Sequence, residues 1–248
     1  MSAALRYRIW PKDPAAHVYE VTVTVADPDP SGQVLTMPAW IPGSYMVRDF
    51  ARNITEVTAS DGGGPVELVK RDKQTWMLGA NDGRVIIRYR VYAFELSVRS
   101  AYLDDKRGYF NGTSLFLRPS GCEDAPWSVR IVPPTGEQYA DWQVFTTMPG
   151  GDLDTRGYGI YRGEGYAALV DYPVEIGPGV ATTFELDGKP HALAVSDGGR
   201  FDIDRIGRDL LPICREHAAM FGELPIGRYL FMVLATGDGY GGLEHRDS

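Results

Sequence analysis

Short runs of alternating polar and apolar residues, separated by Gly, Pro and Asp, dominate the chain from Leu5 to about Ile176. This pattern is typical of antiparallel β-structure, because alternate side chains of a strand face opposite sides of a sheet. The clearest runs are 18–25 (VYEVTVTV) and 84–94 (RVIIRYRVYAF). We predict further strands at 54–59, 75–78, 115–117, 127–132, 158–162 and 166–170. The expected fold class is therefore mainly β, with an antiparallel β-sandwich-like N-terminal domain.

The pattern changes after Gly177-Pro178-Gly179, and we place a domain boundary there, with one domain over residues 1–177 and the beginning of another over 178–248. Two strands are expected at 182–186 and 191–195, and one more at 228–235. Between them, apolar residues at helical spacing predict a helix that Asp202 or Asp204 caps, that Pro212 kinks and that Gly222 ends. The residues expected on its core-facing side are Ile203, Ile206, Leu210, Ile213, Cys214, His217 and Phe221.

Composition excludes several classes of protein. The net charge of −8, with no cluster of Lys and Arg, argues against a nucleic-acid partner. The N-terminal stretch MSAALRYRIWPKDP contains no apolar run, so neither a signal peptide nor a membrane span is predicted there, and we expect a cytoplasmic protein without a membrane partner. The two cysteines, Cys122 and Cys214, are too few and too far apart for a disulfide framework or a four-thiolate zinc site.

Motifs that would carry chemistry are weak or absent. Residues 237–242 (GDGYGG) match the glycine spacing of a dinucleotide-binding loop, but no helix can follow them here, and the expected upstream context is antiparallel. The four histidines are His17, His191, His217 and His245, and no two of them have the four-residue spacing that a His-Glu-x-x-His zinc site requires. No serine stands in a Gly-x-Ser-x-Gly motif. We therefore expect no catalytic residue and no metal ligand in this chain.

Three stretches together resemble the glycyl aminopeptidase family, which are gluzincin zinc metallopeptidases related to aminopeptidase N. The first stretch is 37–54 (MPAWIPGSYMVRDFARNI), and the second consists of 109–116 (YFNGTSLF) and 121–127 (GCEDAPW). The third consists of 221–225 (FGELP), the strand after it and 241–245 (GGLEH). The resemblance covers essentially the whole chain. It implies that residues 178–248 begin a partial α/β, thermolysin-like catalytic domain and end before its zinc-binding helix.

The resemblance also implies a substrate site. Residues 241–245 would form an edge strand to which a peptide adds, with Glu244 binding the free amino terminus. The substrate-binding residues expected on this basis are Gly241, Gly242, Leu243, Glu244, His245 and Asn111.

The implied activity is that of a zinc-dependent aminopeptidase that removes N-terminal residues, with Gly and Ala favoured, from peptides with a free N-terminus. Zinc and its ligands would belong to the full-length parent, whose C-terminal catalytic and PDZ-like regions would be the remaining partners. This chain alone is expected to be inactive. The alternatives are a noncatalytic β-rich binding or scaffolding module and, with less support, a dinucleotide-binding enzyme.

Overall fold

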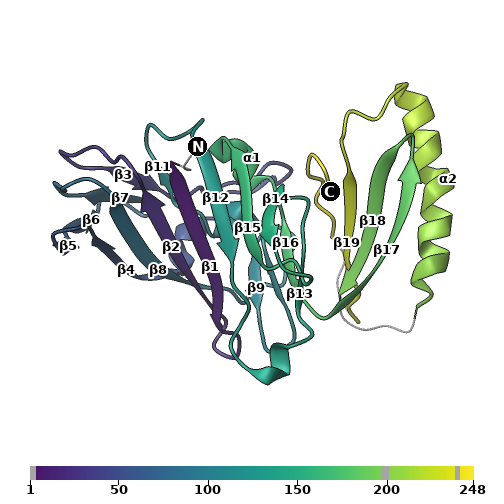
Figure 1. Ribbon diagram of the computed structural model, residues 1–248, viewed down its shortest axis with the longest axis horizontal. Coiled ribbons are helices and arrows are strands. Elements are labelled where there is room, and N and C mark those ends of the chain that lie inside the picture. The colour runs from purple at the N-terminus through teal and green to yellow at the C-terminus, as the bar shows by residue number, and fades with distance from the viewer. Residues whose placement is uncertain (1–3, 197–200, 238–240) are drawn as a thin grey trace.

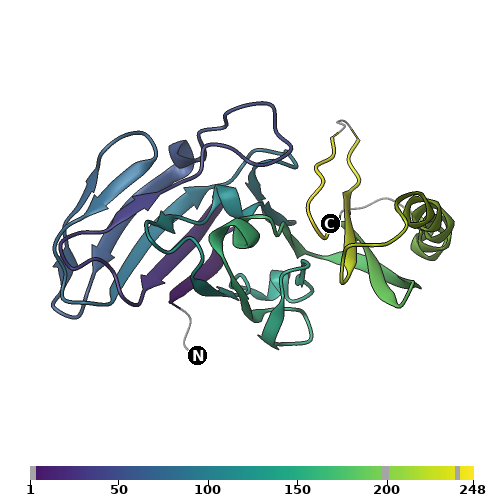
Figure 2. The ribbon, with the colours of Figure 1, turned by 90° about the horizontal axis from the view of Figure 1, so that it is seen from above.

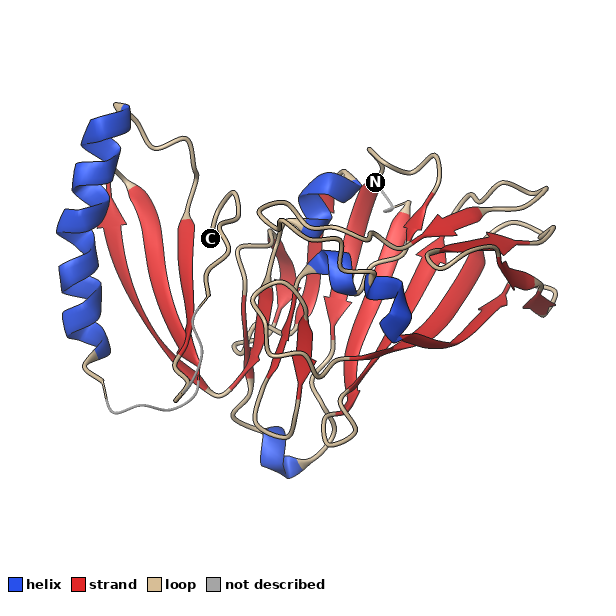
Figure 3. Ribbon diagram, turned by 180° about the vertical axis from the view of Figure 1, so that it is seen from behind, coloured by secondary structure: helices blue, strands red, loops and turns tan. Residues whose placement is uncertain are grey.

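The computed structural model describes residues 4–196, 201–237 and 241–248. The chain is mainly β, as predicted, because strands hold 41% of the described residues and helices 14%. Figures 1 and 3 show a large β-body formed by the first part of the chain and a smaller sheet formed by the last part, which helix α2 (Ile203–Phe221) covers on one face. The segment 177–179 leads from one to the other.

The main layer of the β-body is an eight-stranded sheet in the described part of the chain. Its strands follow the spatial order β14 (Gly150–Leu153), β15 (Gly159–Glu164), β12 (Pro126–Ile131), β1 (Leu5–Asp13), β2 (Val18–Val25), β8 (Val85–Tyr92), β4 (Ile54–Ser60) and β5 (Pro65–Val66). Its pairs are antiparallel except β1 with β12, which run parallel. Every second residue of β2 is buried, so one face of the sheet packs inward.

Two smaller sheets, each four-stranded among the described residues, form the opposing layer. One has the order β13 (Gln143–Phe145), β16 (Val174–Gly177), β10 (Gly108–Phe110), β9 (Ala101–Leu103), and the other β11 (Arg118–Pro119), β3 (Val34–Thr36), β7 (Thr75–Leu78), β6 (Leu68–Lys70). Tyr19 of β2 meets Phe110 of β10 edge-on with ring centroids 5.6 Å apart. One cluster of buried apolar side chains includes residues of all three sheets, so the sandwich shares a single core.

The apolar run 115–117 is not the strand predicted for it. It follows a 3-10 turn, η2 (Gly112–Ser114), and crosses the core without a sheet partner, all three side chains being fully buried. Tyrosine hydroxyls take the place of a neighbouring strand: Tyr89 donates to Leu115 O at 2.5 Å, Tyr166 to Phe116 O at 2.6 Å and Tyr7 to Leu117 O at 2.9 Å. A buried run of this kind cannot be told from a core strand by its composition.

The strand predicted at 166–170 is also wrong, because these residues form the short helix α1 (Tyr166–Val170). Gly165 precedes it at a φ of 74°, a conformation that glycine adopts readily, and turns the chain out of β15. Tyr166 and Leu169, three residues apart, then face the core together. Two more 3-10 turns, η1 (Phe50–Asn53) and η3 (Glu137–Tyr139), lie in loops of the β-body.

The second sheet contains β17 (Gly179–Leu186), β18 (Lys189–Ser196) and β19 (Tyr229–Leu234) among the described residues. β17 and β18 are antiparallel, whereas β18 and β19 are parallel and are joined through α2. The antiparallel context expected before the glycine-rich tail is therefore wrong, since a crossover connection must link parallel neighbours. The predicted strands at 182–186, 191–195 and 228–235 are confirmed, with small shifts of their ends.

Helix α2 begins and ends as the sequence indicates. The Asp202 carboxylate accepts a hydrogen bond from Arg205 N at 2.9 Å, and Gly222 closes the helix at a φ of 83°. The helix continues through Pro212. Its predicted inner side is wrong in part, because Gly207 and Ala218 are the buried residues, whereas His217 is exposed and Phe221 is 74% exposed.

A buried ion pair lies where the two parts of the molecule meet. Arg107 donates to both carboxylate oxygens of Glu175 in β16, at 2.8 and 2.5 Å, and both side chains are almost fully buried. Gln143 Nε2 of β13 donates to Gly179 O at the start of β17 at 3.0 Å. Arg228, just before β19, donates to Thr147 O of the β-body. These contacts seat the second sheet against the sandwich.

Candidate substrate-binding site

The C-terminal segment 241–248 is the region that the sequence singled out for substrate binding. It lies between the β-body and β19 (Figures 1 and 2). The edge strand expected there is wrong for the described residues, because none of 241–248 is in a strand. One backbone hydrogen bond, from Leu230 N to Asp247 O at 3.0 Å, links the segment to β19. Other contacts therefore determine its path.

The first contact joins Leu243 to the loop between β3 and η1. A Cβ placed on Gly43 would lie 2.6 Å from Leu243 Cδ1, so the leucine packs directly on the glycine backbone. Gly43 also has a φ of +80°, which other residues rarely adopt. Leu243 is partly buried and belongs to the edge of the main core. The loop and the tail are thus fitted to each other at this glycine.

The second contact runs through the loop 97–99. Arg99 donates from Nη2 to Gly242 O at 3.1 Å, and the Val98 side chain faces Gly241. Asn111 supports this loop from beneath, because its Nδ2 donates to Val98 O at 2.7 Å. The Asn111 side chain is fully buried and shares that carbonyl with the Tyr109 hydroxyl. Its place in the structure is therefore below the loop that touches the tail, and its substrate-binding role stays a prediction.

The third contact is made by Asp171, immediately after α1. Its Oδ1 lies 3.3 Å from His245 Nδ1, and its Oδ2 accepts from Arg246 N at 3.1 Å. Partial burial would raise the pKa of the Asp171 carboxyl, but the hydrogen bonds from His245 and Arg246 outweigh it and lower the pKa below its ordinary value. The His245 side chain is only 5% exposed, and its Nε2 is buried with no partner among the described residues.

Glu244 lies between these anchored residues and is itself exposed. Its carboxylate is close enough to Tyr229 to contribute, after burial and the nearby Cys214, to the raised pKa of that phenol. An exposed carboxylate on a fixed backbone is suited to binding a compact cation such as a peptide's ammonium group. Its assignment as the anchor remains a prediction.

The tail and the loops that hold it include residues of all three stretches that resemble the glycyl aminopeptidase family, although these stretches are far apart in the sequence. Gly43 belongs to the first stretch, Asn111 to the second, and Gly241, Gly242, Leu243, Glu244 and His245 to the third. Two further loops, at 97–99 and at Asp171, complete the arrangement. The model of the Peptidase M61 N-terminal domain family matches residues 6–178, which include every one of these partners of the tail.

The chain belongs to this peptidase family. An aminopeptidase N family protein from Idiomarina loihiensis is similar over 98% of this M61 chain, with 37% identity and a TM-score of 0.94. An M1 zinc metallopeptidase from Deinococcus radiodurans, solved as a mutant bound to a Tyr-Ser-Ala substrate, matches 92% of it with 14% identity and a TM-score of 0.53, a likeness of fold alone. The chain spans 41% of the first protein and 55% of the second. No curated protein matches it.

The described residues of the M61 chain do not fit a zinc site. No group of three or more His, Cys, Asp and Glu among them is arranged to hold a metal ion. His217 is exposed on α2, and His245 is paired with Asp171. No step of a reaction can therefore be assigned to zinc held by these residues. Across the same part of the chain, no helix has the length and apolar character needed to cross a membrane.

The dinucleotide alternative receives no support from the described part of the tail. Residues 238–240 of the candidate loop lie outside the described residues. A crossover unit is present, but the glycines follow its second strand, β19, whereas a phosphate-binding loop connects the first strand to the helix. No helix occurs within 241–248.

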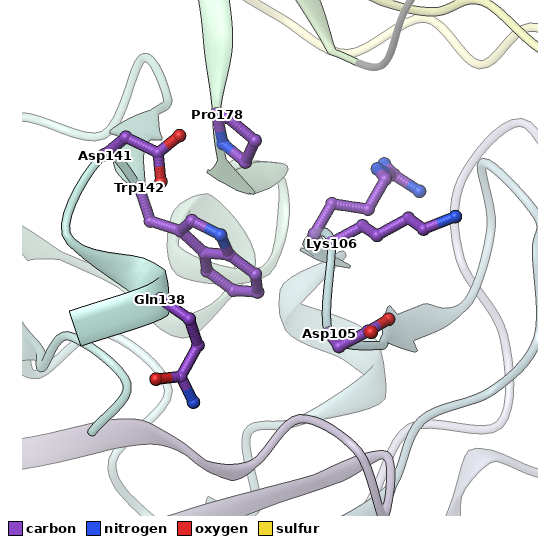
Figure 4. Close-up of a pocket in the computed structure, with 7 residues that line it drawn as sticks. Asp105, Lys106, Gln138, Asp141, Trp142 and Pro178 are labelled. Atoms are coloured by element: carbon purple, nitrogen blue, oxygen red, sulfur yellow. The ribbon is translucent and has the colours of Figure 1, made fainter. Parts of the chain in front are cut away.

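A cavity of about 250 Å³ lies elsewhere, beside the linker between the two parts (Figure 4). Figure 4 shows Pro178 of the linker on one side and the indole of Trp142 turned into the space, with Lys106 opposite. Its remaining lining residues are Asp105, Arg107, Gln138 and Asp141. None of the predicted substrate-binding residues contributes to it.

Sequence reasoning missed Asp171, Val98 and Arg99, although they contact the tail directly. No local pattern marks them, since an acid after a short helix and an Arg in a loop are ordinary surface features. Gly43 did carry a signal, because it stands in the first stretch of the resemblance. The sequence, however, could not show that Gly43 contacts Leu243.

Proposed function

We propose that this chain is the N-terminal portion of a zinc-dependent aminopeptidase that removes N-terminal residues, Gly and Ala being favoured, from peptides with a free amino terminus. The observation that carries the proposal is the exposed Glu244 on a tail held by three separate loops of the M61 domain. Membership of a peptidase family supports it, as does the zinc metallopeptidase that shares the fold and was solved with a tripeptide substrate.

In this proposal, residues 1–177 form the β-sandwich domain and 178–248 begin the catalytic domain. Zinc and its ligands belong to polypeptide outside this chain, in keeping with a relative of which the chain spans 41%. When bound, zinc would supply the activated water that attacks the scissile bond. The residues of this chain do different work: Glu244 binds the substrate ammonium, and the fixed tail sets the distance from it to the scissile bond.

The first experiment uses the parent protein encoded beyond Ser248. We expect it to hydrolyse peptides that begin with Gly or Ala, to lose this activity to a chelator and to regain it with zinc, whereas the 248-residue chain hydrolyses none of them. If the parent is inactive, or is unaffected by the chelator, the proposal is wrong. Binding without hydrolysis would favour the noncatalytic binding module instead.

The second experiment tests the anchor. Glu244→Gln keeps the size of the side chain but removes the charge that pairs with an ammonium group, so KM for free-amine peptides should rise roughly tenfold or more. Inhibition by the same peptides with an acetylated N-terminus should not change. Glu223→Gln, at another exposed acid of the same part of the chain, is the matched control and should leave both values unaltered. Equal losses for free and acetylated peptides would show that Glu244 is not the anchor.

A further inference from the structure

Asp171 joins two regions of the chain that lie 74 residues apart. Its backbone is the C-cap of α1 and donates to Ala168 O, while Leu169, two residues earlier, is fully buried. The carboxylate therefore extends from a fixed part of the sandwich. It uses both oxygens on the tail, one for the His245 ring and the other for the Arg246 N–H.

These two bonds fix the tail immediately after Glu244. On the other side, Leu243 rests on Gly43 and Gly242 O accepts from Arg99. Glu244 is thus held at both of its neighbours while its own side chain is exposed. Such restraint is needed here, because two glycines precede it and glycine loses more conformational freedom than any other residue when it is ordered.

The contact between Asp171 and His245 lies inside the protein. The imidazole is almost fully buried, and its Nε2 has no partner among the described residues, so the hydrogen bond at Nδ1 is the one that its ring makes there. Asp171 provides the partner for Nδ1. The lowered pKa of the carboxyl is consistent with this geometry, since it reflects the donors that converge on Asp171.

We propose that Asp171 is a positioning residue for the recognition of peptides with a free amino terminus. It acts through His245 and the Arg246 backbone, which together hold Glu244 in the orientation that meets the substrate's ammonium group. The inference rests on the proposed function and assigns a role to a residue that does not itself touch substrate. A variant without the Asp171 carboxylate still contains Glu244, but the Glu244 backbone is free to move and its carboxylate loses its orientation.

Kinetics of the parent protein test this role. Asp171→Ala should raise KM for free-amine peptides roughly tenfold, because a misplaced binding group loses much of its effect. The inhibition constant of the acetylated peptides should stay within about twofold, since they do not use Glu244. Asp171→Asn should recover only part of the loss, because its single amide oxygen can accept one of the two hydrogen bonds and its NH2 group can accept neither.

Asp154→Ala is the matched control. Asp154 also accepts two hydrogen bonds, but both come from backbone N–H groups, those of Arg156 and Tyr158 at 2.9 and 3.0 Å, within a turn of the sandwich. A purely structural effect would alter both variants alike and would change free-amine and acetylated peptides equally. That outcome would overturn the positioning role.

Hydrogen exchange of the 248-residue chain tests the same contact without activity. Asp171→Ala should speed exchange of the Arg246 amide, and of the Leu230 amide that bonds to Asp247 O, at least tenfold, whereas Asp154→Ala should not. Unchanged exchange would contradict the inference. An inactive wild-type parent would instead reject the proposed function, and the exchange data would still decide whether Asp171 holds the tail.

Discussion

At the scale of single residues, tyrosine hydroxyls do work that is usually done by a neighbouring strand. Tyr7, Tyr89 and Tyr166 are fully or almost fully buried, and burial raises the pKa of each phenol, so all three stay protonated donors at neutral pH. Tyr89 has a double role, because its oxygen also accepts from Leu117 N at 3.1 Å. These partners are 26 to 110 residues apart in the chain, and no sequence pattern connects them.

Tyr89→Phe should therefore destabilise the protein more than Tyr7→Phe. The first variant leaves a buried carbonyl and a buried N–H without their partner, at about 1–3 kcal/mol each, and the second leaves one carbonyl. We expect a loss of about 3 kcal/mol against about 1–2 kcal/mol in urea unfolding. Tyr92→Phe, at a half-exposed tyrosine of β8, should change stability by less than about 0.5 kcal/mol. Equal losses for Tyr89 and Tyr7 would contradict the double role.

At the scale of elements, helix α2 approaches β17 closely at a glycine. A Cβ on Gly207 would lie 2.8 Å from Thr182 Cγ2, which is closer than real Cβ contacts allow. Glycine is the poorest helix former apart from proline, so its presence in the middle of α2 reflects packing rather than propensity. The same close approach explains why Gly207 is buried in α2.

Gly207→Ala should thus lower stability, although the same change in an exposed helix would raise it by about 1 kcal/mol. We expect a net loss of about 1–2 kcal/mol, because the new methyl group overfills the contact with Thr182. Thr182→Ser removes the clashing Cγ2 and keeps the hydroxyl, so the double variant should recover most of the loss. Thermal or urea unfolding of the four proteins forms a double-mutant cycle. Additive effects would mean that the two side chains do not meet.

Features that depend on one element alone could be predicted from the sequence, whereas features that depend on packing between elements could not. The ends of α2 were predictable, because Asp202 and Gly222 act on their own turn of helix. The side of α2 that faces the sheet was not, since Ile213, His217 and Phe221 have helical spacing but β17 covers another side. Likewise, residues 166–170 became a helix because Gly165 turns the chain and Tyr166 and Leu169 share one buried face.

At the scale of the whole molecule, the candidate site depends on contacts that no single stretch encodes. The fold class followed from period-two alternation, which is a property of each strand alone. The grouping of Gly43, Arg99 and Asp171 around the tail follows instead from how the sandwich and the second sheet meet. A resemblance could mark the tail, but it could not show that residues outside the marked stretches hold it.

A buried carboxylate, that of Glu175, lies near the junction between the β-body and the second sheet. Burial raises the pKa of the Glu175 carboxyl, and the Arg107 guanidinium only partly offsets this. Such pairs add little net stability over apolar packing, but an unpaired survivor is costly.

Glu175→Ala should accordingly cost about 3–5 kcal/mol, because it leaves the Arg107 guanidinium buried without a counter-charge. The double variant Arg107→Met, Glu175→Leu should regain most of that loss, since no unpaired charge remains. Urea unfolding measures the stability of the single and the double variant. A double variant as unstable as Glu175→Ala would show that the ion pair itself, and not the avoidance of a lone charge, stabilises the protein at this place.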